Sequence, residues 1–233
     1  MIEAEWWEYD SIEEMADAVA GDVGFIIESA IDARDASLIA LPGGATPRPI
    51  LPKLAAAKLP WRKVTIIPTD ERLVPMSDEL SNVRALAQAF LPSGARVLPI
   101  ASEKLDPAAA GNSADALLRD LPWPPDLVWL GMGEDGHTAS LFPGPDLEGA
   151  LDAPKARRVV GVTPEPLPAE APVPRVTLTR SAILSARTIL ITIRGQKKRD
   201  ILEQAIEDGH SSKLPIGRVL AEADQAIDIH WAP

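Results

Sequence analysis

Short apolar runs alternate with amphipathic stretches along the chain, and each kind of run predicts one kind of element. Amphipathic stretches with helical spacing predict helices over residues 12–34, 81–91, 106–121 and 195–208. Apolar runs predict buried strands over residues 37–41, 64–68, 96–100, 127–130 and 188–193, a short strand over 175–179 and a final edge strand over 226–231. Because strands and helices alternate, we expect an α/β fold with a mostly parallel sheet and helices on both of its faces.

Capping residues mark where two of the helices should begin. Ser11 and Glu14 have the spacing of a capping box at the start of the first helix. After the strand at 37–41, Thr46 is a good N-cap and Pro47 a good first helical residue. A further proline, Pro52, should kink or delay that second helix.

Composition narrows the class of protein. The chain has 233 residues, of which 46% are hydrophobic, and we expect one domain over residues 1–233. The six prolines of residues 154–174 predict an extended surface loop within that domain. A net charge of −11 disfavours nucleic acid and anionic membranes as partners, because both require basic surface. The chain has no cysteine, which excludes disulfides and thiol chemistry.

The first residues and the length of the apolar runs bear on location. Residues 1–8 are acidic and lack the basic and apolar regions of a signal peptide. No apolar run approaches the ~20 residues that a membrane helix needs. We therefore expect a cytoplasmic protein. The oligomeric state is left open, with a monomer slightly favoured.

Polar clusters follow several predicted strands, at the points where the strands end. The clusters are Gly43, Gly44 and Thr46; Asp70, Glu71 and Arg72; Asp135 and His137; and Gly195 with Lys198. In an open parallel sheet, ligands bind outside the carboxyl ends of the strands, so we expect these clusters to form one site. Asp70 lies nearest to the end of its strand and should point into a cleft, the alternative being a solvated loop.

The turn after the strand at 127–130 presents an acid and a histidine, Asp135 and His137. A histidine moves protons near neutral pH and a neighbouring carboxylate sets its tautomer, so this turn is a candidate catalytic corner. The alternative is a turn histidine that bonds only to backbone. Residues 131–136 also match the G-x-G-x-x-G dinucleotide fingerprint. We reject that interpretation because two acids would repel a pyrophosphate and the prolines within 142–145 exclude a long helix.

Glycine, threonine and two cations supply the elements of an anion site. Gly43, Gly44 and Thr46 could form a cradle in which backbone N–H groups and a hydroxyl face phosphate oxygens, although an ordinary strand-to-helix turn would use the same residues. Arg175 and Lys198 are the candidate cations. Lys198 falls in the first turn of a predicted helix, where a cation opposes the helix dipole and needs a compensating anion. A solvated surface lysine is the alternative.

The motifs that carry a family resemblance occur in a fixed order: residues 42–47, 69–75, 81–82, 131–144 and 175–179. Over nearly its whole length the chain resembles the glucosamine-6-phosphate isomerase/6-phosphogluconolactonase family, and within it the lactonases. The resemblance implies a Rossmann-like fold of the sugar-phosphate isomerase and CoA-transferase type. It also implies hydrolysis of 6-phospho-D-glucono-1,5-lactone to 6-phosphogluconate, in the oxidative pentose phosphate pathway, with no cofactor and no metal.

The resemblance also implies a role for each candidate residue. His137 would be the general base for water, with Asp135 orienting it. Asp70 and Arg72 would line the sugar pocket, with Arg72 the candidate for stabilising the developing oxyanion. The phosphate would be held by Gly43, Gly44, Thr46, Arg175 and Lys198. A δ-lactone is a reactive ester, so a positioned water, one base and an oxyanion partner are sufficient for its hydrolysis.

Two other functions would use many of the same residues. Deaminase-isomerases of this fold carry a glutamate five residues past the histidine, where this chain has Phe142. An aldose–ketose rearrangement needs that additional acid, so its absence favours the lactonase. A non-catalytic sugar-phosphate sensor would keep the phosphate residues and lose the base, and the intact pair of Asp135 and His137 argues against it.

Overall fold

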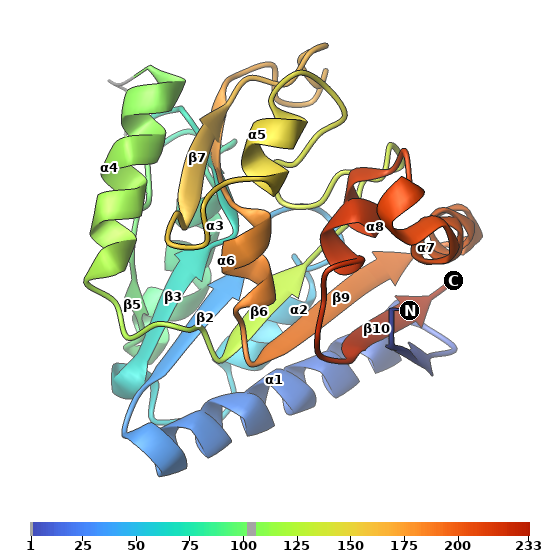
Figure 1. Cartoon of the computed structure of the whole chain (residues 1–233). Helices are drawn as coiled ribbons and strands as arrows, with labels where there is room; N and C mark the ends of the chain where they lie inside the picture. Colours follow the sequence, from blue (N-terminus) through green and yellow to red (C-terminus); the bar gives the residue numbers. More distant parts are fainter. Residues whose placement is uncertain (1, 102–105) are drawn as a thin grey trace.

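A seven-stranded sheet forms the centre of the computed structural model, which describes residues 2–101 and 106–233 (Figure 1). Its strand order is β1-β10-β9-β6-β2-β3-β5, and every neighbouring pair is parallel. The strands are β1 (Ala4–Glu8), β2 (Ser37–Leu41), β3 (Val64–Pro68), β5 (Arg96–Val97), β6 (Leu127–Leu130), β9 (Thr188–Arg194) and β10 (Ile227–Ala232). The predicted α/β fold with a mostly parallel sheet is confirmed.

Helices cover both faces of this sheet (Figure 1). They are α1 (Ile12–Arg34), α2 (Ile50–Ala55), α3 (Asn82–Phe90), α4 (Pro107–Arg119), α5 (Leu147–Leu151), α6 (Arg180–Leu184), α7 (Gln196–Asp208) and α8 (Pro215–Leu220). Within residues 2–101 and 106–233, none of these helices combines the length and the apolar character needed to cross a membrane.

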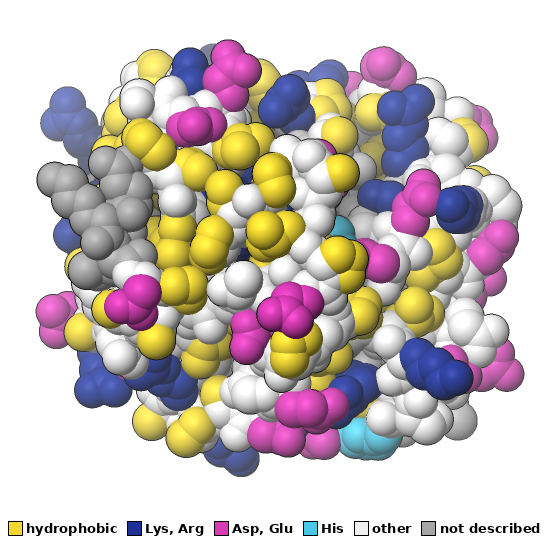
Figure 2. Space-filling view, turned by 90° about the horizontal axis from the view of Figure 1, so that it is seen from above, with side chains coloured by type: hydrophobic (Ala, Val, Ile, Leu, Met, Phe, Trp, Pro, Cys, Tyr) yellow, Lys and Arg dark blue, Asp and Glu magenta, His cyan; other side chains and the backbone are white. Residues whose placement is uncertain are grey.

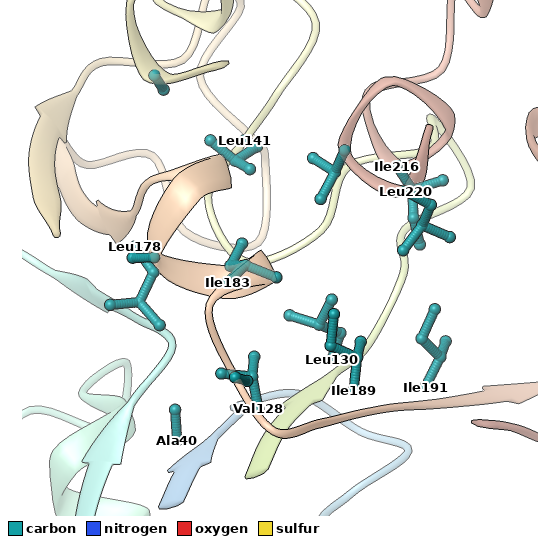
Figure 3. Close-up of a cluster of buried hydrophobic side chains, with 14 of the residues drawn as sticks. Ala40, Val128, Leu130, Leu141, Leu178, Ile183, Ile189, Ile191, Ile216 and Leu220 are labelled. Atoms are coloured by element: carbon teal, nitrogen blue, oxygen red, sulfur yellow. The ribbon is translucent and has the colours of Figure 1, made fainter. Parts of the chain in front are cut away.

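The two faces are separated by the alternation of side chains along each strand. On β2, Ile39 and Leu41 pack with the apolar sides of α1, α2 and α3. Leu38 and Ala40 face the opposite cluster, which includes side chains from α4 to α8. Figure 3 shows part of this second cluster, in which Ala40 lies with residues from β6, β9, α6 and α8. Both faces are buried, so most side chains of the central strands are apolar.

The first helix begins where the capping pattern predicts. The Ser11 hydroxyl accepts a hydrogen bond from the Glu14 N–H at 3.1 Å. The Glu14 carboxylate reaches back one residue further than in the standard box, and accepts from the Asp10 N–H at 3.0 Å. Strands β2, β3 and β6 also have the predicted bounds, which shows how strongly apolar runs and caps define these elements locally.

A small antiparallel sheet stands beside the main one, with the order β4-β8-β7. Its strands are β4 (Asp70–Arg72), β7 (Val159–Val162) and β8 (Arg175–Leu178). The prediction of an extended loop over residues 154–174 is therefore wrong in part, because Val159 and Val162 are buried and pair with β8. The pairing of β4 with β8 places Arg72 opposite Arg175, so two predicted site residues become neighbours through this sheet.

Three other predictions about the helices and strands need correction. The second helix does not begin at Thr46 and Pro47; α2 begins at Ile50, and the Pro47 carbonyl accepts the N–H groups of Ile50 and Leu51. The predicted strand at 96–100 ends at Val97, shortly before a proline that lacks an N–H. The last strand is not an edge, because β1 pairs with its outer side.

Candidate active site

A cavity of about 290 Å³ opens where β2 and β6 end, beside the small sheet. Eight of the nine predicted site residues line it: Gly43, Gly44, Thr46, Asp70, Arg72, His137, Arg175 and Lys198. The ninth, Asp135, contacts His137 and does not line the cavity itself. Segments that follow β2, β3, β6 and β9 therefore meet at one cavity, as expected of parallel strands whose ends share one edge. Figure 2 views the molecule from the side on which β2, β3 and β6 end, and there acidic and basic side chains are intermixed around apolar ones.

The histidine and its acid form a tight pair. His137 Nδ1 lies 2.5 Å from Asp135 Oδ1, and the same oxygen accepts the His137 backbone N–H at 3.1 Å. Burial alone would raise the pKa of Asp135, but its hydrogen bonds with His137 and the attraction of that ring outweigh burial and lower the pKa. The carboxylate therefore stays ionised. It holds the Nδ1 side of the ring and fixes the ring's orientation.

Glycines shape the turn that carries this pair. The Gly133 N–H donates to the His137 carbonyl at 2.9 Å, and the Gly136 N–H to the Gly133 carbonyl at 3.1 Å. A Cβ on Gly133 would lie 2.2 Å from His137 ring atoms, so only glycine leaves room for the ring. Gly136 has a φ of 76°, which favours glycine. The next helix, α5, begins only at Leu147, so these glycines serve the histidine and do not open a dinucleotide-binding helix.

Phe142 lies against the histidine. Its ring centroid is 4.0 Å from that of His137, with 22° between the planes, and the Arg175 guanidinium lies 4.7 Å from the same ring. The position at which deaminase-isomerases carry glutamate is thus occupied by an aromatic ring that stacks on the candidate base. This packing leaves no carboxylate at that place.

Asp70 and Arg72 lie in a strand, and not in a solvated loop. Asp70 is buried, and its carboxylate accepts from the Ser140 hydroxyl at 2.6 Å and from the Thr69 hydroxyl at 3.2 Å. Arg72 donates to the Leu80 carbonyl at 3.2 Å and to the side-chain oxygen of Asn82. Both side chains are therefore held by neighbours before any ligand binds.

Three cationic side chains line the cavity, those of Arg72, Arg175 and Lys198. Arg175 is 2% exposed and donates to the Ala171 carbonyl at 2.9 Å, while Lys198 donates to the Met132 carbonyl at 2.6 Å. Burial lowers the pKa of both groups. Among residues 2–101 and 106–233, neither forms a salt bridge, and neither does Arg72. An anionic ligand would relieve this arrangement.

The lysine before Lys198 behaves differently. Lys197 has a side chain that is 71% exposed, and it pairs with Glu134 at 2.5 Å. Lys198, on the same turn of α7, points to the cavity and to the Met132 carbonyl instead. The surface-lysine alternative therefore describes Lys197 and not Lys198.

Sequence reasoning assigned no role to three polar residues around the cavity, although Glu71 belongs to one of the predicted clusters. Asn82 and Glu170 line it, and Glu71 lies buried behind it. Glu71 accepts the N–H groups of Arg72, Asn82 and Val83 at 2.7–2.8 Å. Burial raises the pKa of Glu71 in spite of these bonds. Asn82 belongs to the 81–82 motif, which was the available signal, but the motif alone assigns no contact to it.

Comparison with known proteins identifies the family to which the chain is similar. The chain matches the family model described as Glucosamine-6-phosphate isomerases/6-phosphogluconolactonase over residues 10–231. It is 38% identical to the 6-phosphogluconolactonase of Rhizobium meliloti over 223 residues, which cover 94% of each chain. It is 37% identical to that of Pseudomonas putida over 232 residues, which cover 95% of this chain and 93% of the relative.

Solved structures give the same result. The crystal structure of a 6-phosphogluconolactonase from Shewanella baltica superposes with a TM-score of 0.91 at 31% identity, and covers 100% of both chains. A monomeric glucosamine-6-phosphate deaminase superposes with a TM-score of 0.79 at 19% identity, and covers 97% of each chain. The second likeness shows a shared fold only.

Proposed function

The chain belongs to the family of glucosamine-6-phosphate isomerases and 6-phosphogluconolactonases, and we propose that it hydrolyses 6-phospho-D-glucono-1,5-lactone to 6-phosphogluconate in the oxidative pentose phosphate pathway. The observation that carries the proposal is the His137–Asp135 pair at 2.5 Å, at the same cavity as three cations that form no salt bridge within the described residues. One group can activate water while the others bind an anionic substrate.

His137 acts as the general base in this proposal. Its Nε2 takes a proton from a water molecule while the water oxygen attacks C1 of the lactone. The bond between C1 and the ring oxygen then breaks, and the ring oxygen takes the proton back from His137. The product acid releases a proton to solvent. Water is the only co-reactant, so the balance requires no cofactor. Asp135 keeps the ring oriented throughout and stabilises the imidazolium that forms.

Arg72 is the proposed partner of the developing oxyanion. It lines the cavity, and its guanidinium is already oriented by Asn82 and the Leu80 carbonyl. A donor that is in place before the reaction stabilises charge without reorganising at the moment of reaction. Asp70, whose carboxylate accepts from the Ser140 hydroxyl, would accept a hydrogen bond from a sugar hydroxyl.

The phosphate end of the substrate is assigned to the cations and the turn after β2. Arg175 and Lys198 would pair with the phosphate, and Gly44 and Thr46 line the same cavity. Binding energy from this remote group holds the lactone ring against His137. Gly44 and Ala45 are exposed, and a Cβ on Gly44 would meet no atom within 4 Å, so this turn is open to a ligand.

The test is hydrolysis by the purified protein. It should release 6-phosphogluconate from the lactone well above the spontaneous rate, which is measured without enzyme and subtracted. It should release no ammonia from glucosamine 6-phosphate, because Phe142 occupies the place of the acid that the rearrangement needs. Absence of lactone hydrolysis would refute the proposal, and ammonia release would favour the deaminase-isomerase instead.

A further inference from the structure

We propose that Asn82 is a positioning residue that aligns Arg72 with Asp70 for the reaction, and that position 43 is glycine because the Asn82 amide occupies the space of a Cβ. This inference rests on the proposed function for its kinetic consequence. It assigns to Gly43 a role other than the anion cradle that its sequence suggests. The close approach of Gly43 and Asn82 exists independently of any substrate.

The backbone of Asn82 is fixed on two sides. It is the first residue of α3, directly after Ser81, whose hydroxyl caps the helix by accepting the Arg84 N–H at 3.1 Å. The Asn82 N–H donates to the buried Glu71 carboxylate at 2.8 Å. The start of α3 is therefore tied to β4, the strand that carries Asp70 and Arg72. The Asn82 side chain consequently has a defined origin.

The side-chain amide uses both of its ends. Its Nδ2 donates to the Asp70 carbonyl at 2.7 Å and lies 3.4 Å from Asp70 Oδ1, while its Oδ1 accepts from the Arg72 guanidinium. An amide carries a donor and an acceptor on separate atoms of one short side chain, so it can bind both neighbours at once. Aspartate would keep the acceptor for Arg72, but would place a second carboxylate beside that of Asp70. Alanine would release both neighbours.

Gly43 completes the arrangement from the end of β2. A Cβ on Gly43 would lie 1.9 Å from Asn82 Oδ1 and 2.6 Å from its Cγ. These distances are far below any real contact, and Asn82 is buried, with two neighbours holding its amide. Gly44 differs: a Cβ there meets no atom within 4 Å, and its φ of 99° alone favours glycine. The two adjacent glycines are thus required for separate physical reasons.

The first experiment measures lactone hydrolysis by Asn82→Ala. We expect kcat to fall on the order of 10- to 100-fold, because a displaced Arg72 no longer meets the oxyanion, while KM changes less because Arg175 and Lys198 are untouched. The matched control is Asn112→Ala. Asn112 is the only other asparagine in the sequence, and it also accepts from an arginine, Arg157, but on the exposed surface of α4. An unchanged kcat in Asn82→Ala, or an equal loss in Asn112→Ala, would overturn the inference.

Asn82→Asp provides a second variant of nearly the same size. The new carboxylate would face that of Asp70, and two close carboxylates share a proton more readily than two distant ones. The rate of Asn82→Asp relative to wild type should therefore rise as the pH is lowered, since protonation of the pair restores a donor. A ratio that is independent of pH would contradict the contact with Asp70.

A double-mutant cycle tests the space at Gly43. Gly43→Ala should lower both kcat and the thermal midpoint, but should add little once Asn82→Ala has emptied that space. Gly44→Ala should instead add its full effect to Asn82→Ala, because its cost is local backbone strain. Additive effects of Gly43→Ala and Asn82→Ala would refute the inference. The thermal cycle needs no activity, so an inactive wild type would refute the proposed function alone.

Discussion

Replacement of Gly133 by alanine tests whether the glycine turn exists to place the histidine. The new Cβ would lie 2.2 Å from His137 ring atoms and 2.6 Å from Asp135 Oδ1. To reach an ordinary contact of 3.4 Å, the ring must move by about 1.2 Å. That movement disrupts the 2.5 Å contact between Nδ1 and the carboxylate. A misplacement of this size costs on the order of 10²-fold in rate, and we expect kcat to fall by about that factor.

The assay follows 6-phosphogluconate formation with the spontaneous rate subtracted, and a thermal midpoint is measured beside it. KM should change less than kcat, because Arg175 and Lys198 contact other atoms. Gly131→Ala is the matched control: Gly131 lines the same cavity in the same turn, but a Cβ there meets no atom within 4 Å. We expect Gly131→Ala to keep most of its activity.

Two outcomes would refute this reasoning. One is a folded Gly133→Ala enzyme with nearly wild-type kcat, which would mean that the position of the His137 ring is not critical. The other is an equal loss in Gly131→Ala, which would mean that any side chain in the turn is harmful. A Gly133→Ala protein that loses kcat and keeps its thermal midpoint would isolate the catalytic effect.

The other predictions concern the base, the anion site and a buried histidine. In the corrected assay, His137→Asn should lower kcat on the order of 10²–10⁴-fold. Asp135→Asn should lower kcat less, because Asp135 orients the base without taking the proton. A nearly wild-type kcat in His137→Asn would exclude His137 as the base. Lys198→Ala should raise KM strongly, by the factor that corresponds to losing the ~1.5–3 kcal/mol of a charge-assisted hydrogen bond. Lys197→Ala should leave KM unchanged. Equal KM values for the two variants would contradict the anion site. Burial lowers the pKa of His230 from 6.5 to about 4, so the native state resists a proton that the unfolded chain accepts. The contribution of neutral His230 to the free energy of unfolding should therefore be fully present above about pH 6.5. It should fall by about 3 kcal/mol as the pH drops to about 4. The free energy of unfolding, measured with urea at each pH, should fall less steeply with decreasing pH in His230→Gln than in the wild type. An identical pH dependence in the two proteins would refute the assignment.

The elements that the sequence predicted well are those with local signals. Strands β2, β3 and β6 are apolar runs bounded by polar residues, and α1 begins at its cap, Ser11. Strand β1 was missed because its sequence, Ala4–Glu8, is short and two of its five residues are glutamate. Its existence depends on pairing with β10, more than two hundred residues away in sequence, and no local pattern reports that pairing. The same holds for β7, which proline-rich flanks conceal and β8 defines.

The sequence by itself determined which chemical groups the protein can use. Acids, a histidine, a lysine and glycines follow the ends of buried strands, and parallel strand ends share one edge, so a common site was expected from the alternation of strands and helices. The family resemblance added the roles. None of this depended on a side-chain position.

Only the tertiary structure decided how those groups meet. It selected Lys198 over Lys197 for the cavity, stacked Phe142 on His137, and filled the space above Gly43 with the amide of Asn82. Each of these depends on side-chain directions and on distances of a few tenths of an ångström between segments that are remote in the chain. A sequence pattern specifies the period and polarity of one segment, but contacts between segments are set by how all of them pack together.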